Sequence, residues 1–181
     1  MTGVQTCALP ISPAVGKSST SKALASIFNK SLQIPVDILR DMVVSGLVLP
    51  GLDWSEELVQ QLRLARESAI HMAMIYQKAD FAVVIDDFFD PNQMEEYLSL
   101  LNQPGVHKVV LFPDQETAHA RNFKRSGDDP ARDYIDVGIR NVYQQLNSSI
   151  ENLRLNGWIV VDTTNLSIDE TVLEILNHSS A

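Results

Sequence analysis

The sequence is poor in cysteine and in long apolar runs. Its single cysteine, Cys7, excludes a disulfide framework within one chain and is typical of a reducing cytoplasm, where we expect the protein to reside. No apolar run approaches the ~20 residues that a membrane-spanning helix requires, and the longest strand-like runs are FAVVI and VVLF. The first ten residues lack the basic start and apolar centre of a signal peptide. We therefore expect no membrane partner.

Positive charge is also scarce. The chain has 14 lysine and arginine residues against 23 aspartate and glutamate residues, which gives a formal net charge of -9. Because nucleic-acid binding normally needs a basic face, this balance opposes a nucleic-acid partner. A bound anion must instead be held locally, by a loop and a few arginines. With 45% apolar residues in 181, the composition predicts one globular domain with its own core.

The stretch AVGKSST contains most of a phosphate-binding loop. The pattern G-x-x-x-x-G-K-[ST] is matched at Gly16, Lys17 and Ser18, but Ile11 stands where its first glycine belongs. Backbone N–H groups at a helix N-terminus can cradle phosphate oxygens, while Lys17 would bridge the β- and γ-phosphates and Ser18 would bind magnesium. The residues expected to bind the nucleotide are Val15, Gly16, Lys17, Ser18 and Ser19.

The segment before the loop, MTGVQTCALPI, resembles the translated reading frame of a sequencing adapter fused to a truncated gene. A buried central strand should precede such a loop, yet this segment carries Gln5 and Thr6, and Pro10 cannot donate a ladder hydrogen bond. We therefore expect residues 1–11 to be non-native, with the native first strand missing or replaced. The chain should then fold poorly unless residues 3–10 substitute as a strand. A divergent native N-terminus is the alternative.

From residue 12 onward, apolar strands alternate with helical segments, which predicts a single three-layer α/β domain on a parallel sheet over residues 12–181. Capping boxes are expected between Asp53 and Glu56 and between Ser167 and Glu170, and Asp90, Pro91 and Gln93 are expected to begin a further helix. The predicted strands cover residues 32–36, 81–85, 107–112 and 158–161, and the predicted helices include residues 17–28, 38–44, 55–78 and about twenty residues from 131.

VVIDD is an apolar run that ends in Asp86 and Asp87. Ligands of open α/β sheets gather at the carboxyl ends of the strands, so Asp86 is expected to join Ser18 as a magnesium ligand. Asp87 is expected to bind the substrate by orienting a nucleophile, or to support Asp86. Both acids have the alternative of simply starting a loop.

Asp37 ends the second predicted strand, in PVDILR. A carboxylate there would lie across the crevice from the γ-phosphate and accept the proton of a substrate hydroxyl as that oxygen attacks. We expect Asp37 to be this base and part of the acceptor site, with Arg40 one turn later holding an anionic or polar part of the acceptor. The alternative for Asp37 is a helix N-cap.

Arg121 and Arg125 lie four residues apart in HARNFKRSGDDPAR, and Arg132 follows the turn. Guanidinium groups on a mobile segment over about residues 117–132 would close over the phosphates and stabilise the charge that spreads during transfer. We expect Arg121 and Arg125 to be catalytic in this way, although a solvated helix face would explain the same residues. The DTTN stretch after the last strand either contacts the nucleotide base or caps a helix.

The chain from residue 12 onward resembles the P-loop small-molecule kinases, in particular the chloramphenicol phosphotransferase-like proteins, within a wider group that includes AAA-family ATPase-like proteins. The stretches that carry the resemblance are AVGKSST, PVDILRDMVVSG, VVIDD, LFPDQETAHARNFKR and WIVVDTTNLSIDE. It implies a five-stranded parallel sheet, ATP with Mg²⁺ as phosphoryl donor, and an aspartate after the second strand as base. The departure from the family pattern is at Ile11.

Three functions remain open from the sequence. The first is an ATP-dependent phosphotransferase acting on a hydroxyl of a small molecule. The second is a nucleotide-binding regulatory ATPase-like module that acts through a partner protein. The third, a polynucleotide kinase, is disfavoured by the charge of -9. The acceptor and the oligomeric state are not indicated.

Overall fold

The computed structural model describes residues 6–9, 15–49, 55–88, 95–129 and 131–179, and the statements below concern these residues. Five strands form one sheet in the order β2-β3-β1-β4-β5, and all four strand pairs are parallel. Their bounds are β1 Thr6–Leu9, β2 Ser31–Pro35, β3 Ala82–Asp86, β4 Val106–Leu111 and β5 Trp158–Val161. The expected parallel α/β architecture is therefore confirmed.

The central strand β1 is formed by the segment that was expected either to leave the sheet without its first strand or to substitute for that strand. Thr6–Leu9 pairs with β3 on one side and with β4 on the other, and so occupies the position expected to be missing or replaced. A strand between two partners is held by backbone hydrogen bonds on both edges, which any non-proline residue can make. The strand begins after Gln5 and ends before Pro10, so neither of those two residues stands within the paired segment.

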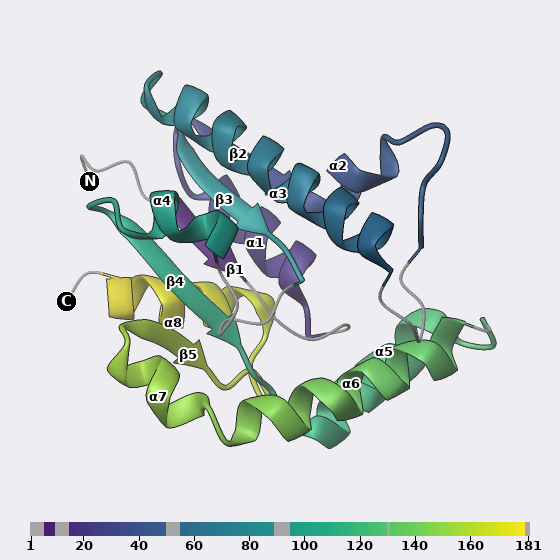
Figure 1. Ribbon diagram of the computed structural model, residues 1–181. Coiled ribbons are helices and arrows are strands. Elements are labelled where there is room, and N and C mark those ends of the chain that lie inside the picture. Colours follow the sequence, from purple (N-terminus) through teal and green to yellow (C-terminus); the bar gives the residue numbers. More distant parts are fainter. Residues whose placement is uncertain (1–5, 10–14, 50–54, 89–94, 130, 180–181) are drawn as a thin grey trace.

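Helices cover both faces of the sheet and give three layers (Figure 1). Alternate residues of β3 face opposite sides: Val83 and Ile85 belong to one core cluster and Val84 to the other, as the period of a strand requires. The first cluster includes residues of α3, α4 and α7, and the second includes residues of α1 and α8. The helix bounds are α1 Lys17–Ser26, α2 Val36–Asp41, α3 Glu56–Gln77, the 3₁₀ helix η1 Glu95–Tyr97, α4 Leu98–Leu101, α5 Gln115–Ser126, α6 Ala131–Asn147, α7 Ile150–Leu155 and α8 Ile168–Ser179.

Several helix boundaries differ from the predictions, among them those of α2, which spans Val36–Asp41 where residues 38–44 were predicted. The helix cap of α3 is Ser55, whose side chain accepts a hydrogen bond from the Leu58 N–H at 3.2 Å. Glu56 is then the first helical residue, and Asp53 lies outside the described residues, as do Asp90, Pro91 and Gln93. The long helix predicted from residue 131 ends at residue 147 and is followed by the separate helix α7.

The capping box predicted for α8 is present. The Ser167 N–H donates to Glu170 Oε2 at 2.8 Å, and Ser167 Oγ accepts from the Glu170 N–H at 3.3 Å.

None of the helices in the described ranges is both long enough and apolar enough to span a bilayer.

Candidate active site

The N-terminus of α1 differs from those of the other long helices in a way that suits an anion. Gly16 is its N-cap and has a φ of 94°, a left-handed conformation that favours glycine. Within the described residues, α1 has neither a capping side chain nor an acid in its first turn. By contrast, α3 and α5 have capping side chains from Ser55 and Asp114 and acids in their first turns. The uncapped N–H groups of α1 are therefore available to a phosphate.

Lys17, the first residue of α1, lies within electrostatic range of three carboxylates. Burial lowers the pKa of Lys17, while the charges of Asp86, Asp37 and Asp87 act to raise it and that of Arg125 acts to lower it. Its Nζ atom also lies 5.9 Å from the centre of the Phe88 ring. The fold thus brings together residues that the sequence separates by more than a hundred positions.

Asp86 lies at the end of β3 and beside two serine hydroxyls. Burial raises its pKa, and this effect is opposed by a hydrogen bond from Ser18, by the charge of Lys17 and by Ser21. Ser21 Oγ donates to Asp86 Oδ2 at 3.3 Å and accepts from Gln33 Nε2 at 2.7 Å. A hydroxyl and a carboxylate in contact beside an uncapped helix N-terminus are oxygen donors of the kind that Mg²⁺ prefers.

The donor set fits a magnesium ion that is also held by phosphate and water. In the described ranges, no group of three or more His, Cys, Asp or Glu side chains is placed to hold a metal. Mg²⁺ usually takes only one or two carboxylates and completes its shell with substrate phosphates and water. Ser18 and Asp86 would serve as such a partial set. Burial pushes Lys17 and Asp86 toward their neutral forms, and a polyphosphate with a divalent cation would favour both charged forms.

Asp87 is held by residues that the sequence analysis did not identify. Arg66 Nε donates to Asp87 Oδ2 at 2.9 Å, and Tyr97 Oη donates to the same oxygen at 2.9 Å. Asp87 Oδ1 accepts from the Phe88 N–H at 2.7 Å, and Arg66 Nη2 donates to the Phe88 carbonyl at 3.2 Å. This buried cluster joins α3, β3 and η1. Support of Asp86 by Asp87 and direct contact of Asp87 with the substrate both stay predictions.

Asp37 and Arg40 lie in the six-residue helix α2. Asp37 is the second residue of α2 rather than its N-cap, which is Pro35, and its side chain is exposed. Its charge acts on the pKa of both Lys17 and Asp86, so it faces the same site. The Arg40 side chain is only 10% exposed, and its Nη2 lies 4.0 Å from Asp41 Oδ1. Among the described residues, its buried Nε has no hydrogen-bond partner.

The predicted lid is one end of a helical hairpin. Figure 1 shows α5 and α6 running together along the lower edge of the molecule and extending past the sheet. The buried Asn122 side chain joins them, because its Nδ2 donates to the Arg132 carbonyl at 3.1 Å and to Asp136 Oδ1 at 2.9 Å. His119 Nδ1 lies 2.8 Å from the same Asp136 oxygen. Polar contacts of this kind hold the two helices together as one unit.

The three lid arginines occupy different environments. Arg121 Nη2 donates to the Thr163 carbonyl at 2.7 Å, and Nη1 donates to Thr163 Oγ1 at 3.2 Å and to the Val15 carbonyl at 3.5 Å. It therefore ties α5 to the DTTN stretch and to the phosphate loop. Arg125 is exposed and acts on the pKa of Lys17. Arg132 Nη1 donates to the Gly127 carbonyl at 2.9 Å, which stabilises the turn of the hairpin.

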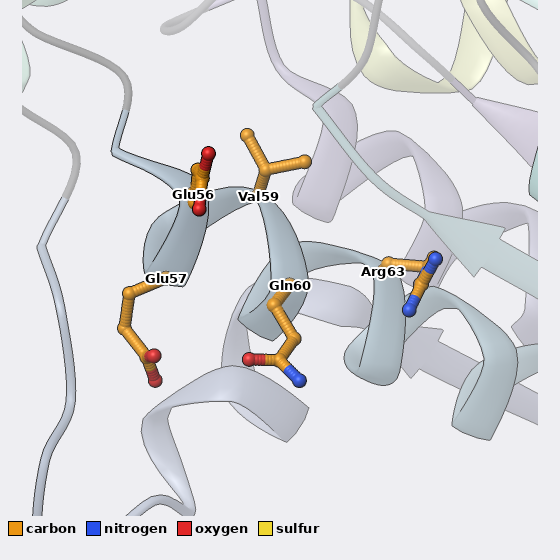
Figure 2. A pocket seen from close by; sticks show the side chains of 5 residues that line it. All are labelled: Glu56, Glu57, Val59, Gln60 and Arg63. Carbon is orange, nitrogen blue, oxygen red and sulfur yellow. The ribbon is translucent and has the colours of Figure 1, made fainter.

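The first two turns of α3 line a pocket of about 490 Å³ (Figure 2). None of the described residues predicted for the site contributes to it. Figure 2 shows Glu57 and Gln60 extending to the same side of the helix. This pocket was not predicted from the sequence, because its lining residues have the pattern of the exposed polar face of a long helix. Its lining residues are Glu56, Glu57, Val59, Gln60 and Arg63.

Comparison with known proteins places this arrangement among the P-loop kinase folds. No protein-family model and no curated sequence matches the chain. Its structure is similar to a gluconokinase from Sinorhizobium meliloti 1021, with a TM-score of 0.62, 14% identity, and coverage of 99% of this chain and 93% of that chain.

Two further solved structures give the same result. A shikimate kinase from Acinetobacter baumannii in complex with shikimate has a TM-score of 0.63 at 13% identity, with coverage of 96% of this chain and 92% of that chain. A tunicamycin resistance protein from Deinococcus radiodurans has a TM-score of 0.58 at 19% identity, with coverage of 96% and 94%. The chain therefore has the three-layer α/β fold shared by these P-loop kinases.

Proposed function

We propose that this chain is an ATP-dependent phosphotransferase that moves the γ-phosphoryl group of Mg-ATP to a hydroxyl group of a small molecule. The observation that carries the proposal is that the uncapped N-terminus of α1 begins with Lys17, whose pKa is affected by the charges of Asp86 and Asp37. Phosphoryl transfer to an alcohol needs an anion-binding helix end, a cationic side chain beside it and an acidic side chain on the acceptor side.

Each of these residues has a defined task in the proposed reaction. Mg-ATP supplies the transferable phosphoryl group and the divalent charge. Residues 15–19 bind the phosphate oxygens through backbone N–H groups, and Lys17 holds the β- and γ-phosphates. Ser18 and Asp86 hold the cation, while Asp87 fixes the end of β3 through Arg66 and Tyr97.

The acceptor side and the lid complete the mechanism. The exposed Asp37 carboxylate takes the proton of the acceptor hydroxyl as that oxygen attacks, and Arg40 offers a guanidinium with an unfilled donor nearby. Arg125, whose charge acts on the pKa of Lys17, stabilises the charge on the equatorial oxygens. Arg121 holds the lid to the phosphate loop in this conformation.

A regulatory nucleotide-binding module is the second candidate. The observation that favours it is Ile11, which stands where the loop pattern has its first glycine and lies outside the described residues. This candidate expects slow ATP hydrolysis that no hydroxyl compound stimulates. The phosphotransferase expects ADP release to rise above the water background when its acceptor is added.

The experiment that tests the proposal replaces the base. Asp37→Asn should reduce phosphoryl transfer to a responding sugar, nucleoside or hydroxyl-bearing antibiotic by roughly 10²- to 10⁴-fold, the usual contribution of a general base. ATP binding should stay within about twofold, because the residues of α1 are untouched. Transfer is measured by coupled ADP detection, and binding by titration with a fluorescent ATP analogue.

Asp41→Asn is the matched control, since Asp41 lies one turn after Asp37 on the same short helix and is 60% exposed. It should retain at least half of the wild-type turnover. Unchanged turnover in Asp37→Asn would show that another group accepts the proton.

A further inference from the structure

Two polar side chains outside the predicted site contact the residues proposed to hold magnesium. Ser21, in the second turn of α1, is completely buried. Gln33 is half-buried in β2, where it is paired with Val84 of β3, two residues before Asp86. A buried hydroxyl group needs hydrogen-bond partners inside the protein, so the partners of Ser21 show what it holds in place.

The donors and acceptors around Ser21 determine the direction of its hydrogen bonds. Gln33 Nε2 lies 2.7 Å from Ser21 Oγ and 3.2 Å from the Ser18 carbonyl oxygen, and its two N–H groups can donate to both. The Gln33 amide must present its nitrogen here, because an amide oxygen would face the carbonyl without a proton between them. Ser21 Oγ lies 3.1 Å from the same carbonyl and 3.3 Å from Asp86 Oδ2, but it has a single proton. Since Gln33 satisfies the carbonyl, that proton can be donated to Asp86.

These contacts fix the carboxylate of Asp86 against α1. Asp86 is 4% exposed at the end of β3, so the orientation of its carboxylate depends on partners within the protein. A hydrogen bond to Oδ2 restricts rotation of the carboxylate and therefore sets the direction of both oxygens. Gln33 at the same time holds the main chain at Ser18, whose hydroxyl is the other proposed ligand. Loss of an outer-shell hydrogen bond of this kind typically lowers metal affinity by about 10- to 100-fold.

A second serine of α1 shows what the contacts of Ser21 add. Ser26 Oγ donates to the Lys22 carbonyl at 2.8 Å, a common bond from a helical serine to the preceding turn. Ser26 is exposed, at the end of α1 opposite to the phosphate loop. Ser21 makes the same kind of bond and in addition contacts Gln33 and Asp86. These additional contacts connect β2, α1 and β3 at the proposed magnesium site.

From these contacts we propose that Ser21, held by Gln33, is a positioning residue that fixes Asp86 for the magnesium ion. The proposal rests on the Mg-ATP binding that the proposed function includes. Ser21 itself touches neither nucleotide nor acceptor, because its side chain has no exposed surface. Its loss should therefore weaken the contribution of the cation to nucleotide binding and leave the contribution of the phosphate loop unchanged.

The test uses the full chain and a fluorescent, non-hydrolysable ATP analogue, titrated once in EDTA and once in saturating Mg²⁺. The Kd in EDTA divided by the Kd in Mg²⁺ measures the coupling between cation and nucleotide. Ser21→Ala should lower this ratio about tenfold, at the lower end of the expected range because the contact with Asp86 is long at 3.3 Å. The Kd in EDTA should stay within about twofold. In turnover assays, the apparent KM for Mg²⁺ should rise about tenfold, while kcat at saturating Mg²⁺ stays within about threefold.

Ser26→Ala is the matched control, because it removes a hydroxyl from the same helix without affecting Asp86. It should keep the wild-type ratio. Gln33→Met keeps the length of the side chain but removes both N–H donors, and should lower the ratio less than Ser21→Ala does. The double variant Ser21→Ala/Gln33→Met should match Ser21→Ala within about twofold, because Gln33 acts on Asp86 through Ser21. Ser21→Cys fills the same space with a weaker donor and should give an intermediate ratio.

Several results would overturn the inference. One is a wild-type ratio near one, and another is an equal ratio in Ser21→Ala, Ser26→Ala and the wild type. If Ser21→Ala raised both Kd values by the same factor, Ser21 would support the phosphate loop as a whole rather than the cation. Independent effects of Ser21→Ala and Gln33→Met in the double variant would contradict the connection between the two residues.

A failure of the proposed function is seen separately, because the ratio is measured without an acceptor. If no alcohol is phosphorylated while Ser21→Ala still lowers a wild-type ratio well above one, the phosphotransferase is contradicted and the positioning role of Ser21 stands. If an alcohol is phosphorylated but the ratio is the same in both proteins, the phosphotransferase stands and the role of Ser21 is overturned.

Discussion

At the scale of single residues, the buried pair of Arg66 and Asp87 joins α3 to the residue that follows β3. Both side chains are at most 12% exposed, and their atoms meet at 2.9 Å. Among the described residues, removal of Arg66 would leave the buried Asp87 carboxylate with the Tyr97 hydroxyl and one backbone N–H as hydrogen-bond donors. Breaking a buried ion pair in this way costs roughly 3 to 5 kcal/mol. We therefore expect Arg66→Met to lower the free energy of unfolding by about that amount, measured by guanidinium denaturation.

Arg63→Met provides the control on the same helix. Arg63 is 57% exposed and lies 3.8 Å from Glu67, a surface pair of the kind that contributes about 0 to 1 kcal/mol. The double variant Arg66→Met/Asp87→Asn should recover part of the lost stability, because it removes the buried charge. Equal losses in Arg63→Met and Arg66→Met would mean that the cluster joining α3, β3 and η1 contributes little.

At the scale of elements, the α5 and α6 hairpin couples the lid to pH. Partial burial acts to raise the pKa of Asp136, but hydrogen bonds from Asn122 and His119, together with the charges of His119 and Arg140, outweigh it and lower the pKa. A carboxylate with a lowered folded pKa contributes stability above its unfolded pKa of about 4. That contribution to stability is lost as the pH falls through the pKa of the carboxylate in the folded protein. The free energy of unfolding should therefore fall below about pH 4, and more steeply in the wild type than in Asp136→Asn.

The role of Asp136 must be measured by comparing variants, because the pKa values of other carboxylates are lowered as well. Hydrogen bonds from Thr117 lower the pKa of Asp114, and hydrogen bonds from Ser167 lower that of Glu170. Asp133→Asn is the control, since Asp133 is on α6 but 84% exposed. Its pH dependence should match that of the wild type. Identical slopes in Asp136→Asn and the wild type would contradict a role for the Asn122 and His119 contacts.

The sequence predicts those elements whose signals are local. Apolar runs that end in aspartate predicted β3, and the spacing of Ser167 and Glu170 predicted the start of α8. Arg66 was missed because its partner is 21 residues away on another element, and helical periodicity does not pair elements. One signal was available: Arg66 is four residues after the buried Leu62, on the inward side of α3. A cation on that side needs a buried acid.

The strand β1 was predicted only as a condition, namely that residues 3–10 substitute for the native first strand. The sequence of this segment lacks the apolar run of a central strand, yet the strand forms between β3 and β4. Its position is specified by the two neighbours, whose backbone groups supply the hydrogen bonds. Local composition therefore could not predict it, whereas the pattern of the remaining strands and helices requires a strand at that position.

At the scale of the whole molecule, the central position of β1 makes the fold depend on four residues. Ala8 is paired with Ile85 of β3 and with Lys108 of β4. A proline at position 8 would remove a ladder N–H and cost roughly 3 kcal/mol or more. We expect the wild type to unfold in one cooperative thermal transition, and Mg-ATP at 100 times its Kd to add about 2.7 kcal/mol. For 181 residues this corresponds to a rise of about 5 to 10 °C in Tm.

Ala8→Pro should lower Tm by at least about 6 °C and weaken the shift produced by Mg-ATP, because β1 leads into the phosphate loop. The matched control is Ala8→Ser, which keeps the backbone N–H group. Ala8→Ser should retain the Mg-ATP shift. Both quantities, Tm and its shift with Mg-ATP, are measured by scanning calorimetry. An Ala8→Pro protein with the Tm of the wild type would show that the sheet does not depend on residues 6–9. It would also show that the phosphate loop is held by other contacts.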